Sequence, residues 1–354
     1  MKRSASYTMR DVARLARVSV TTVSSVVNGR GGISPEVTRR VEDAIATLDY
    51  HPNEVARGLK VNRSFTIGII VPDVSNLFFN EILRGVESEA RRNSYSVILC
   101  DSNEDPAQEQ ELLTLLVRRR VDGILLASTQ ASLAESRLAM RRPPIVCFDR
   151  DPGGFEGPAV TVDNVLASCE ATRHLIELGH QQIAIIAGPE TILTGSGRLE
   201  GFRKALQTAH LPLREEYVRP GDFSMQGGHR AALEILQLAN PPTAILVSNN
   251  RMTLGLMRAL RDLGLKCPQD LSVVGFDDFD WSDLFSPRLT TIVQPSYEMG
   301  KRATEVLLQV IQAPDKHLDS GKGKEHRIVL RAELRVREST APPAAGLNHP
   351  PNKN

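Results

Sequence analysis

The chain has 354 residues, of which 41% are hydrophobic and 24% charged, and its formal net charge is +1. These values are ordinary for a globular protein of two or three domains whose core needs no disulfides. The four cysteines contain no C-x-x-C pair, so we expect reduced side chains in a reducing compartment. The start MKRSASYTMRDV lacks a signal-peptide segment and no long apolar run follows, which predicts a cytoplasmic protein without a membrane span.

The charge is distributed unevenly along the chain. Residues 1–63 contain eleven Lys and Arg against six Asp and Glu, whereas the remaining residues carry a small negative excess. A basic N-terminal region on a mildly acidic body indicates a polyanion partner for that region alone. A solvated helical surface could have the same charge, so this observation is weak by itself.

Three short helices are predicted in the N-terminal region. Thr8 can cap the first, with Asp11 as its capping-box partner, and Ser19 can cap a second over residues 20–28. Ser34 and Pro35 have the residue types that begin a third helix. The expected buried residues of the first two helices are Val12, Leu15, Val23, Val26 and Val27, and those of the third are Val37, Val41, Ala44, Ile45 and Leu48.

A helix, a tight turn and a second helix within about twenty residues indicate a helix-turn-helix. Thr21, Thr22 and Ser25 lie near the exposed start of the second helix, where small hydroxyl side chains can contact base edges or thymine methyls. Ser19 and the helix N-terminus can hold a backbone phosphate. The alternative is a plain three-helix bundle in which these residues are solvated caps.

From residue 65 onward, apolar strand-like segments alternate with helical stretches. The expected strands cover residues 65–71, 95–100, 123–128, 145–148, 159–162, 183–188, 243–248, 271–276 and 290–293. Continuous apolar strands separated by helices predict parallel sheets covered on both faces, and this number of strands favours two α/β lobes. Residues 327–338 alternate and are interpreted as an edge strand, while the Pro-rich residues 339–354 are expected to be disordered.

Polar residues follow several of these strands, where ligand sites in parallel sheets lie. They are Asp73, Ser75, Asn76, Asp149, Arg150, Asn249, Asp277 and Gln294, and Arg198 is expected to begin the helix after residues 183–188. A single Asp after a strand is often only a helix cap, but several around one cleft favour a binding site. Asp, Asn and Arg can each bridge adjacent sugar hydroxyls, and Phe78, Phe79 and Phe223 could cover a sugar ring. Core packing is the alternative for Phe78 and Phe79.

The N-terminal region resembles the lactose-repressor (LacI/GalR) family. The blocks that carry this resemblance are D-V-A-x-x-A-x-V-S, T-V-S-x-V-V-N and Y-x-P-N-x-V-A-R-x-L within residues 8–60. The resemblance implies a hinge helix over residues 53–60 that forms on operator DNA, with Leu59 as an apolar wedge in the minor groove. The DNA-binding residues implied are Ser19, Thr21, Thr22, Ser25, Asn28, Arg57 and Leu59. Ser25 is shorter than the polar residue that the family often carries at this position.

The body resembles the same family to about residue 338, and its sensor resembles ribose-binding relatives through N-L-F-F at residues 76–79, with Leu77 in place of a proline. The effector-binding residues implied are Asn76, Phe78, Phe79, Asp149, Arg150, Arg198, Phe223, Asn249, Asp277 and Gln294. Arg150 and Ile192 differ from the tryptophan and arginine of the purine-responsive branch. Asn250 replaces an aspartate that is common in the family.

The predicted architecture is an all-α helix-turn-helix domain followed by a two-lobed α/β body like that of periplasmic binding proteins. Its expected parts are residues 1–52 for DNA binding, 53–64 for the hinge and linker, 65–338 for effector binding and dimerisation, and 339–354 as a tail. The predicted function is that of a homodimeric transcription repressor, with operator DNA and a small sugar-like effector as partners.

Two other classes of protein explain the sequence less well than a repressor does. A periplasmic solute-binding protein would explain only the body, not the basic N-terminal region. A sugar-modifying enzyme would need a nucleophile or acid–base set that the sequence does not contain, and the eight histidines show no metal-ligand spacing. We therefore expect no enzymatic activity, no cofactor and no metal.

Overall fold

The computed structural model describes residues 7–27, 32–50, 63–130, 143–313 and 326–344. It divides into two compact units, Met1–Ser64 and Phe65–Asn354, which are considered separately as the head and the body. Most of the predicted hinge lies outside the described residues, as do residues 345–354. Among the described helices, none combines the length and apolar character that crossing a membrane requires.

The head contains the three predicted helices, α1 (Met9–Ala16), α2 (Val20–Val27) and α3 (Pro35–Leu48). Their predicted caps are confirmed. An Asp11 carboxylate oxygen accepts hydrogen bonds from the backbone and side chain of Thr8 at 3.0 and 2.7 Å. The Ser19 hydroxyl accepts the backbone N–H of Thr22 at 3.1 Å, and the Ser34 hydroxyl accepts that of Val37 at 3.4 Å. Local residue types therefore determine where all three helices begin.

The core of the head is small. Val12, Val23 and Val41 are fully buried and contribute one side chain from each helix. The prediction for Leu15 was wrong, because its side chain is 49% exposed. The buried residues of α1 are Val12, Ala13 and Ala16, and at 100° per residue Leu15 points well away from that stripe.

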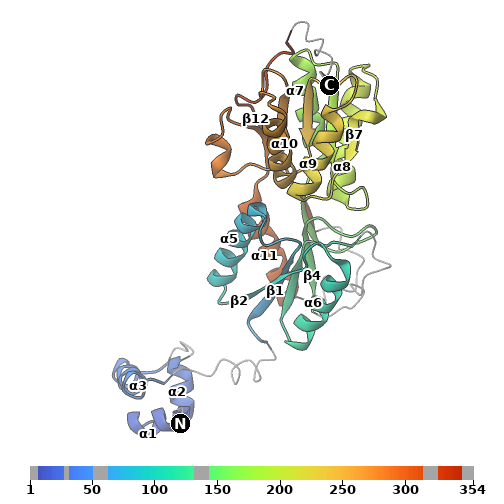
Figure 1. The fold of residues 1–354 in the computed structure, drawn as a ribbon. Coiled ribbons are helices and arrows are strands. Elements are labelled where there is room, and N and C mark those ends of the chain that lie inside the picture. The colour runs from blue at the N-terminus through green and yellow to red at the C-terminus, as the bar shows by residue number, and fades with distance from the viewer. Residues whose placement is uncertain (1–6, 28–31, 51–62, 131–142, 314–325, 345–354) are drawn as a thin grey trace, which may run out of the picture. The chain divides into compact units, whose positions relative to one another are not determined.

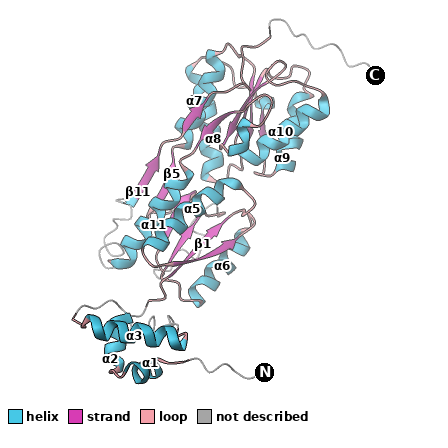
Figure 2. Cartoon of the chain, turned by 90° about the vertical axis from the view of Figure 1, so that its left-hand side faces the viewer, coloured by secondary structure: helices cyan, strands magenta, loops and turns pink. Residues whose placement is uncertain are grey.

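The body contains two six-stranded sheets (Figures 1 and 2). The first sheet has the order β11 (Arg327–Leu330), β5 (Ala159–Val162), β4 (Ile145–Asp149), β3 (Gly123–Leu126), β1 (Thr66–Val71) and β2 (Ser96–Asp101). The second has the order β12 (Glu333–Arg335), β10 (Thr290–Val293), β9 (Ser272–Phe276), β8 (Ala244–Val247), β6 (Ile183–Ala187) and β7 (Val218–Pro220). All neighbours pair in parallel except β10 and β12. The nine strands predicted between residues 65 and 293 are confirmed, and within this range the three-residue β7 was missed.

Helices cover both faces of each sheet. On the first sheet, α5 (Leu77–Arg92) and α11 (Ser296–Gln312) pack on one face and α6 (Pro106–Arg118) on the other. On the second, α7 (Asn164–Glu177) and α8 (Leu193–Thr208) share one face, and α9 (Met225–Leu236) and α10 (Asn250–Leu263) share the other. This two-sided coverage is why the strands are continuously apolar.

Residues 327–338 were predicted as one edge strand, and this was wrong in number. They form two strands, and each lies at the edge of a different sheet: β11 is parallel to β5, and β12 is antiparallel to β10. Ala332 lies between them and is buried, at the point where the chain crosses from one lobe to the other. An alternating pattern indicates a half-buried edge but does not specify the sheet to which that edge belongs.

The prediction of a disordered tail from residue 339 was also wrong for its first residues. Ser339 is buried, and its hydroxyl donates to the Val273 carbonyl and accepts the Thr290 N–H, both at 2.7 Å. The Thr340 hydroxyl lies 3.0 Å from His174 Nε2. These residues are held by hydrogen bonds, and such contacts leave no apolar pattern in the sequence.

Candidate functional site

A cavity of about 360 Å³ opens between the two lobes of the body. Its lining includes every predicted effector-binding residue: Asn76, Phe78, Phe79, Asp149, Arg150, Arg198, Phe223, Asn249, Asp277 and Gln294. The structure therefore brings this whole set together at the carboxyl ends of the strands of both sheets, as expected for such folds. That these residues bind an effector remains a prediction.

Three cavity residues have the left-handed backbone conformation that favours glycine. Asp149, the last residue of β4, has φ +60°, Asp277, directly after β9, has φ +71°, and Phe223 has φ +61°. Such a conformation costs a non-glycine residue on the order of 1 kcal/mol or more. The packing of the surrounding fold offsets this cost, and the chain turns at Asp149 and Asp277, where their strands end.

Arg150 is almost fully buried and forms a two-pronged ion pair with Glu104. Its Nη1 and Nη2 donate to Glu104 Oε2 and Oε1 at 3.0 and 2.8 Å, and its Nε lies 3.7 Å from Asp149 Oδ2. Burial acts to lower the pKa of Arg150, but the carboxylates of Glu104, Asp149 and Glu109 together outweigh it and raise that pKa above the usual value. The guanidinium also lies over the Phe223 ring at 5.6 Å from its centre.

Arg198 lies on the second turn of α8 rather than at its start, where the sequence analysis placed it. Its Nε donates to Asn164 Oδ1 at 2.8 Å and its Nη1 to the Ser248 carbonyl at 2.5 Å. The guanidinium stacks on the Phe276 ring at 3.6 Å. These contacts hold a buried cation whose charge interacts with the carboxylates of Asp149 and Asp277.

The carboxyl groups of Asp149 and Asp277 are buried and hold their protons more tightly than usual. Burial raises the pKa of Asp149 to about 6, although Arg150 and Arg198 act in the opposite direction. Burial also raises the pKa of Asp277, whose Oδ1 accepts a hydrogen bond from Gln294 Nε2 at 2.6 Å. Groups with poorly solvated charge gain most when ligand hydroxyls donate to them.

Two asparagines of the cavity also cap helices. Asn76 Oδ1 accepts the Phe78 N–H at 3.1 Å at the start of α5, and Asn249 Oδ1 accepts the Met252 N–H at 2.8 Å at the start of α10. Phe78 and Phe79 line the cavity and are also members of the core, with 8% and 3% exposure. The two interpretations of these phenylalanines are therefore compatible, because one face packs and another meets the cavity.

Hydrogen bonds at the edge of the cavity join the lobes. Asn250 Nδ2 donates to Asn76 Oδ1 at 2.7 Å, and Arg251 Nη1 donates to Ser75 Oγ at 2.7 Å. Arg251 also lies 3.6 Å from an Asp73 carboxylate oxygen. Asn250, which departs from the family pattern, thus takes part in a contact between the lobes.

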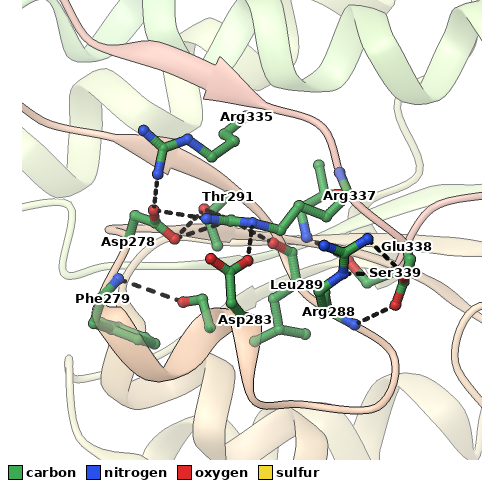
Figure 3. A network of polar contacts seen from close by, with 12 residues as sticks. Asp278, Phe279, Asp283, Arg288, Leu289, Thr291, Arg335, Arg337, Glu338 and Ser339 are labelled. Atoms are coloured by element: carbon green, nitrogen blue, oxygen red, sulfur yellow. Dashed lines mark hydrogen bonds and ion pairs between the residues drawn. The ribbon is translucent and has the colours of Figure 1, made fainter.

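Asp278, the residue after Asp277 in the chain, is held by an ion-pair network in which Asp278 and Arg337 are buried (Figure 3). Arg337 donates through Nη1 and Nη2 to Asp278 Oδ1 and Oδ2 at 3.0 and 2.9 Å, and its Nε lies 2.7 Å from Asp283 Oδ1. Asp278 also accepts the Thr291 hydroxyl at 2.7 Å. Because Asp278 is bonded to Asp277 in the chain, this network supports the strained turn that places the Asp277 carboxylate.

The second helix of the head presents its hydroxyl residues unequally. Thr21 is exposed, Ser25 lies one turn further along and is half-buried, and the Thr22 hydroxyl lies 2.8 Å from Ser19 Oγ. The side chains of Thr21 and Ser25 can therefore contact a partner bound to this helix, while the Thr22 hydroxyl supports the cap at Ser19. The predicted DNA contacts Asn28, Arg57 and Leu59 lie outside the described residues.

Comparison with known proteins agrees with both units. Residues 8–53 match the model of the bacterial regulatory proteins of the lacI family, and residues 64–335 match that of periplasmic binding proteins and the sugar-binding domain of the LacI family. The chain belongs to the LacI family of transcriptional regulators. Its fold class and its function as a DNA-binding regulator, both predicted from the sequence, are thereby confirmed.

Individual relatives align with most of this LacI-family chain and with nearly all of their own length. The HTH-type transcriptional repressor CytR of Escherichia coli strain K12 is 36% identical over 343 residues, covering 96% of this chain and 98% of the relative. The ribose operon repressor of the same organism is 38% identical over 309 residues, with 87% and 94% covered. The structure of the Lac repressor dimer bound to operator and the anti-inducer ONPF aligns with TM-score 0.83 at 30% identity, covering 95% of this chain and 99% of that one.

The structure adds cavity residues of this LacI-family regulator that the sequence analysis missed. The polar ones are Asn103, Glu104, Thr194, Asp222, Ser224 and Arg251. Asn103 and Glu104 follow the carboxyl end of β2, so the rule that found the other residues would have found them as well. Arg251 and Thr194 lie inside the first turns of helices, where no strand end marks them.

Proposed function

We propose that this regulator binds a pseudo-palindromic operator as a homodimer and that a small sugar-like effector, bound between the two lobes, sets its operator affinity. One observation carries the proposal: the ten residues expected to bind the effector all line one cavity of about 360 Å³. Cavities of a few hundred cubic ångströms suit ligands of small-molecule size.

The chemistry of the cavity supports a sugar. Asp149, Asp277 and Asn249 offer oxygen acceptors, and Arg150 and Arg198 offer planar donors that can bridge neighbouring hydroxyls. The rings of Phe78, Phe79 and Phe223 supply apolar surface for the faces of a pyranose or furanose. The similarity to a ribose operon repressor is a further argument for this class of ligand.

The head supports the DNA side of the proposal. Thr21, Thr22 and Ser25 would read bases in the major groove, and Ser19 would contact the DNA backbone. Asn28 would be a further DNA contact, and Arg57 and Leu59 would act from the hinge. A two-fold operator calls for two heads, which favours a homodimer. The structural neighbour named as the Lac repressor dimer bound to operator supports this arrangement. Such a regulator acts by binding rather than by catalysis, in the compartment that holds the chromosome.

The test is Asp277→Ala in the full-length protein. This change removes a buried acceptor that is held by Gln294 and lies near Arg198. We expect effector affinity to fall by about 2–4 kcal/mol, or roughly 30- to 1000-fold. Thermal shift against pentoses and hexoses identifies the ligand, and calorimetric titration then measures its affinity for both proteins.

Glu216→Ala serves as the matched control, because this carboxylate is exposed on the same lobe. Operator binding, followed by gel shift, should persist in Asp277→Ala if the effector is an inducer and should be lost if it is a corepressor. A folded Asp277→Ala protein with unchanged effector affinity would contradict the proposed site.

A further inference from the structure

The charges that line the cavity do not balance. Among the described residues, five carboxylates face three guanidinium groups: Asp73, Glu104, Asp149, Asp222 and Asp277 against Arg150, Arg198 and Arg251. The lining therefore has a formal excess of two negative charges when all these groups are ionised. A ligand that enters this space meets a net negative field.

The charge of Arg150 is neutralised by carboxylates of the cavity wall. Glu104 occupies two of its donors in the geometry of a bidentate ion pair, and Asp149 lies 3.7 Å from its third nitrogen. Glu104 itself is half-buried, so its charge is only partly screened by water. Arg150 Nε has no hydrogen-bond partner among the described residues and can still donate to a neutral hydroxyl, but the guanidinium offers no uncompensated charge to an anion.

The other two arginines are compensated as well. Arg198 directs its Nε and Nη1 to neutral oxygens of Asn164 and Ser248, and the carboxylates of Asp149 and Asp277 act on its charge. Arg251 lies 3.6 Å from Asp73 and donates to Ser75. Each cation in the lining thus already has an acidic neighbour.

Besides the arginines, an anion could bind at the helix N-termini that border the cavity. At three of these N-termini a side chain already caps the helix. The starts of α5, α9 and α10 are capped by Asn76, Ser224 and Asn249, which are themselves cavity residues. α8 begins after Ile192 without a side-chain cap. Its helix dipole amounts to roughly half a positive charge, which is smaller than the excess negative charge of the lining.

We propose that the cavity selects an uncharged polyhydroxylated effector over its phosphorylated form, with Glu104 as the specificity-determining residue. Glu104 acts by cancelling the charge of Arg150, which would otherwise attract a phosphate. This inference rests on the proposed function, because it concerns the ligand of the same site.

The experiment is calorimetric titration of the full-length protein with matched pairs. Ribose is compared with ribose 5-phosphate, and glucose, galactose and fructose are compared with their phosphate monoesters. We expect at least one free sugar to bind and its monoester to bind on the order of 100-fold more weakly, because a dianion enters a net negative site. A monoester that binds as tightly as its free sugar overturns the inference but leaves the proposed function standing. Binding of neither member of any pair overturns the proposed function together with the inference.

Glu104→Gln then tests the role assigned to Glu104. This variant keeps the side-chain length and leaves the charge of Arg150 without its main counter-charge. The ratio of the free-sugar affinity to the monoester affinity should therefore fall by about tenfold. Glu111→Gln, which removes an exposed carboxylate from the same lobe, should leave the ratio unchanged. Glu104→Asp keeps the charge and should retain most of the discrimination. A ratio that stays the same in folded Glu104→Gln would assign the selection to other residues and overturn the role of Glu104.

Discussion

The head and the cavity differ in whether the residues that stabilise the fold are also the residues that would bind a ligand. In the head, the buried valines Val12, Val23 and Val41 hold the helices together, while Thr21 stands exposed and outside that core. In the cavity, Asn76 and Asn249 cap helices and also face the ligand space. Substitutions in the head can therefore separate stability from recognition, whereas most substitutions in the cavity change both.

The largest effect that sharpens this comparison is expected from Arg337→Met. This arginine is 7% exposed and pairs with Asp278, so its loss leaves a buried carboxylate beside Asp277 without its main partner. We expect the free energy of unfolding of the body to fall by about 3–5 kcal/mol, measured by urea denaturation. Arg335→Met is the matched control: Arg335 pairs with the same carboxylate at 2.8 Å but is 56% exposed, so its loss should cost at most about 1 kcal/mol. Equal losses in the two variants would show that burial of the pair is not what stabilises this turn.

A somewhat smaller effect is expected from the pH dependence of Asp149. Its pKa of about 6 in the folded state lies above the value of 3.8 expected when unfolded, so the folded protein binds the additional proton between these values. This group therefore makes the unliganded protein less stable as pH rises from about 4 to about 6, by up to about 3 kcal/mol. Asp149→Asn should remove this part of the decline, as seen by comparing unfolding free energies at pH 4 and pH 7. The exposed Glu111→Gln variant should keep it, and an unchanged decline in Asp149→Asn would contradict the assignment.

The smallest effects are expected in the head. Thr21→Ala should weaken operator binding by about 1 kcal/mol, roughly fivefold, and leave the unfolding temperature of the head nearly unchanged. Ser34→Ala, at a cap that is not among the expected DNA contacts, should lower the stability of the head by about 1 kcal/mol, because the Val37 N–H loses its cap. Gel shift and thermal unfolding of both variants separate the two roles. If Thr21→Ala destabilised the head as much as Ser34→Ala, the head would not separate recognition from stability.

The parts that could be predicted from sequence are those whose signals are local. The caps at Thr8, Ser19 and Ser34 depend on residues three positions apart, and strand ends bring polar residues to a common edge. The pairing of Arg150 with Glu104 and of Arg337 with Asp278 spans 46 and 59 residues. No residue type or period indicates that such distant side chains meet, so these supporting contacts could come only from the structure. The same applies to residues 327–338, whose two strands belong to different sheets.

In each sheet of the body, one edge strand comes from residues 327–335, late in the chain. Until residues 327–335 leave the ribosome, β5 and β10 each lack a neighbour on one side. An unpaired strand edge can pair with another chain. The head, whose core is complete at Tyr50, has no such requirement. A stop codon shortly before Arg327 would therefore produce a folded helix-turn-helix head attached to a body with two unpaired strand edges. We expect such a polypeptide to aggregate, and not to behave as a repressor that has only lost its sensor.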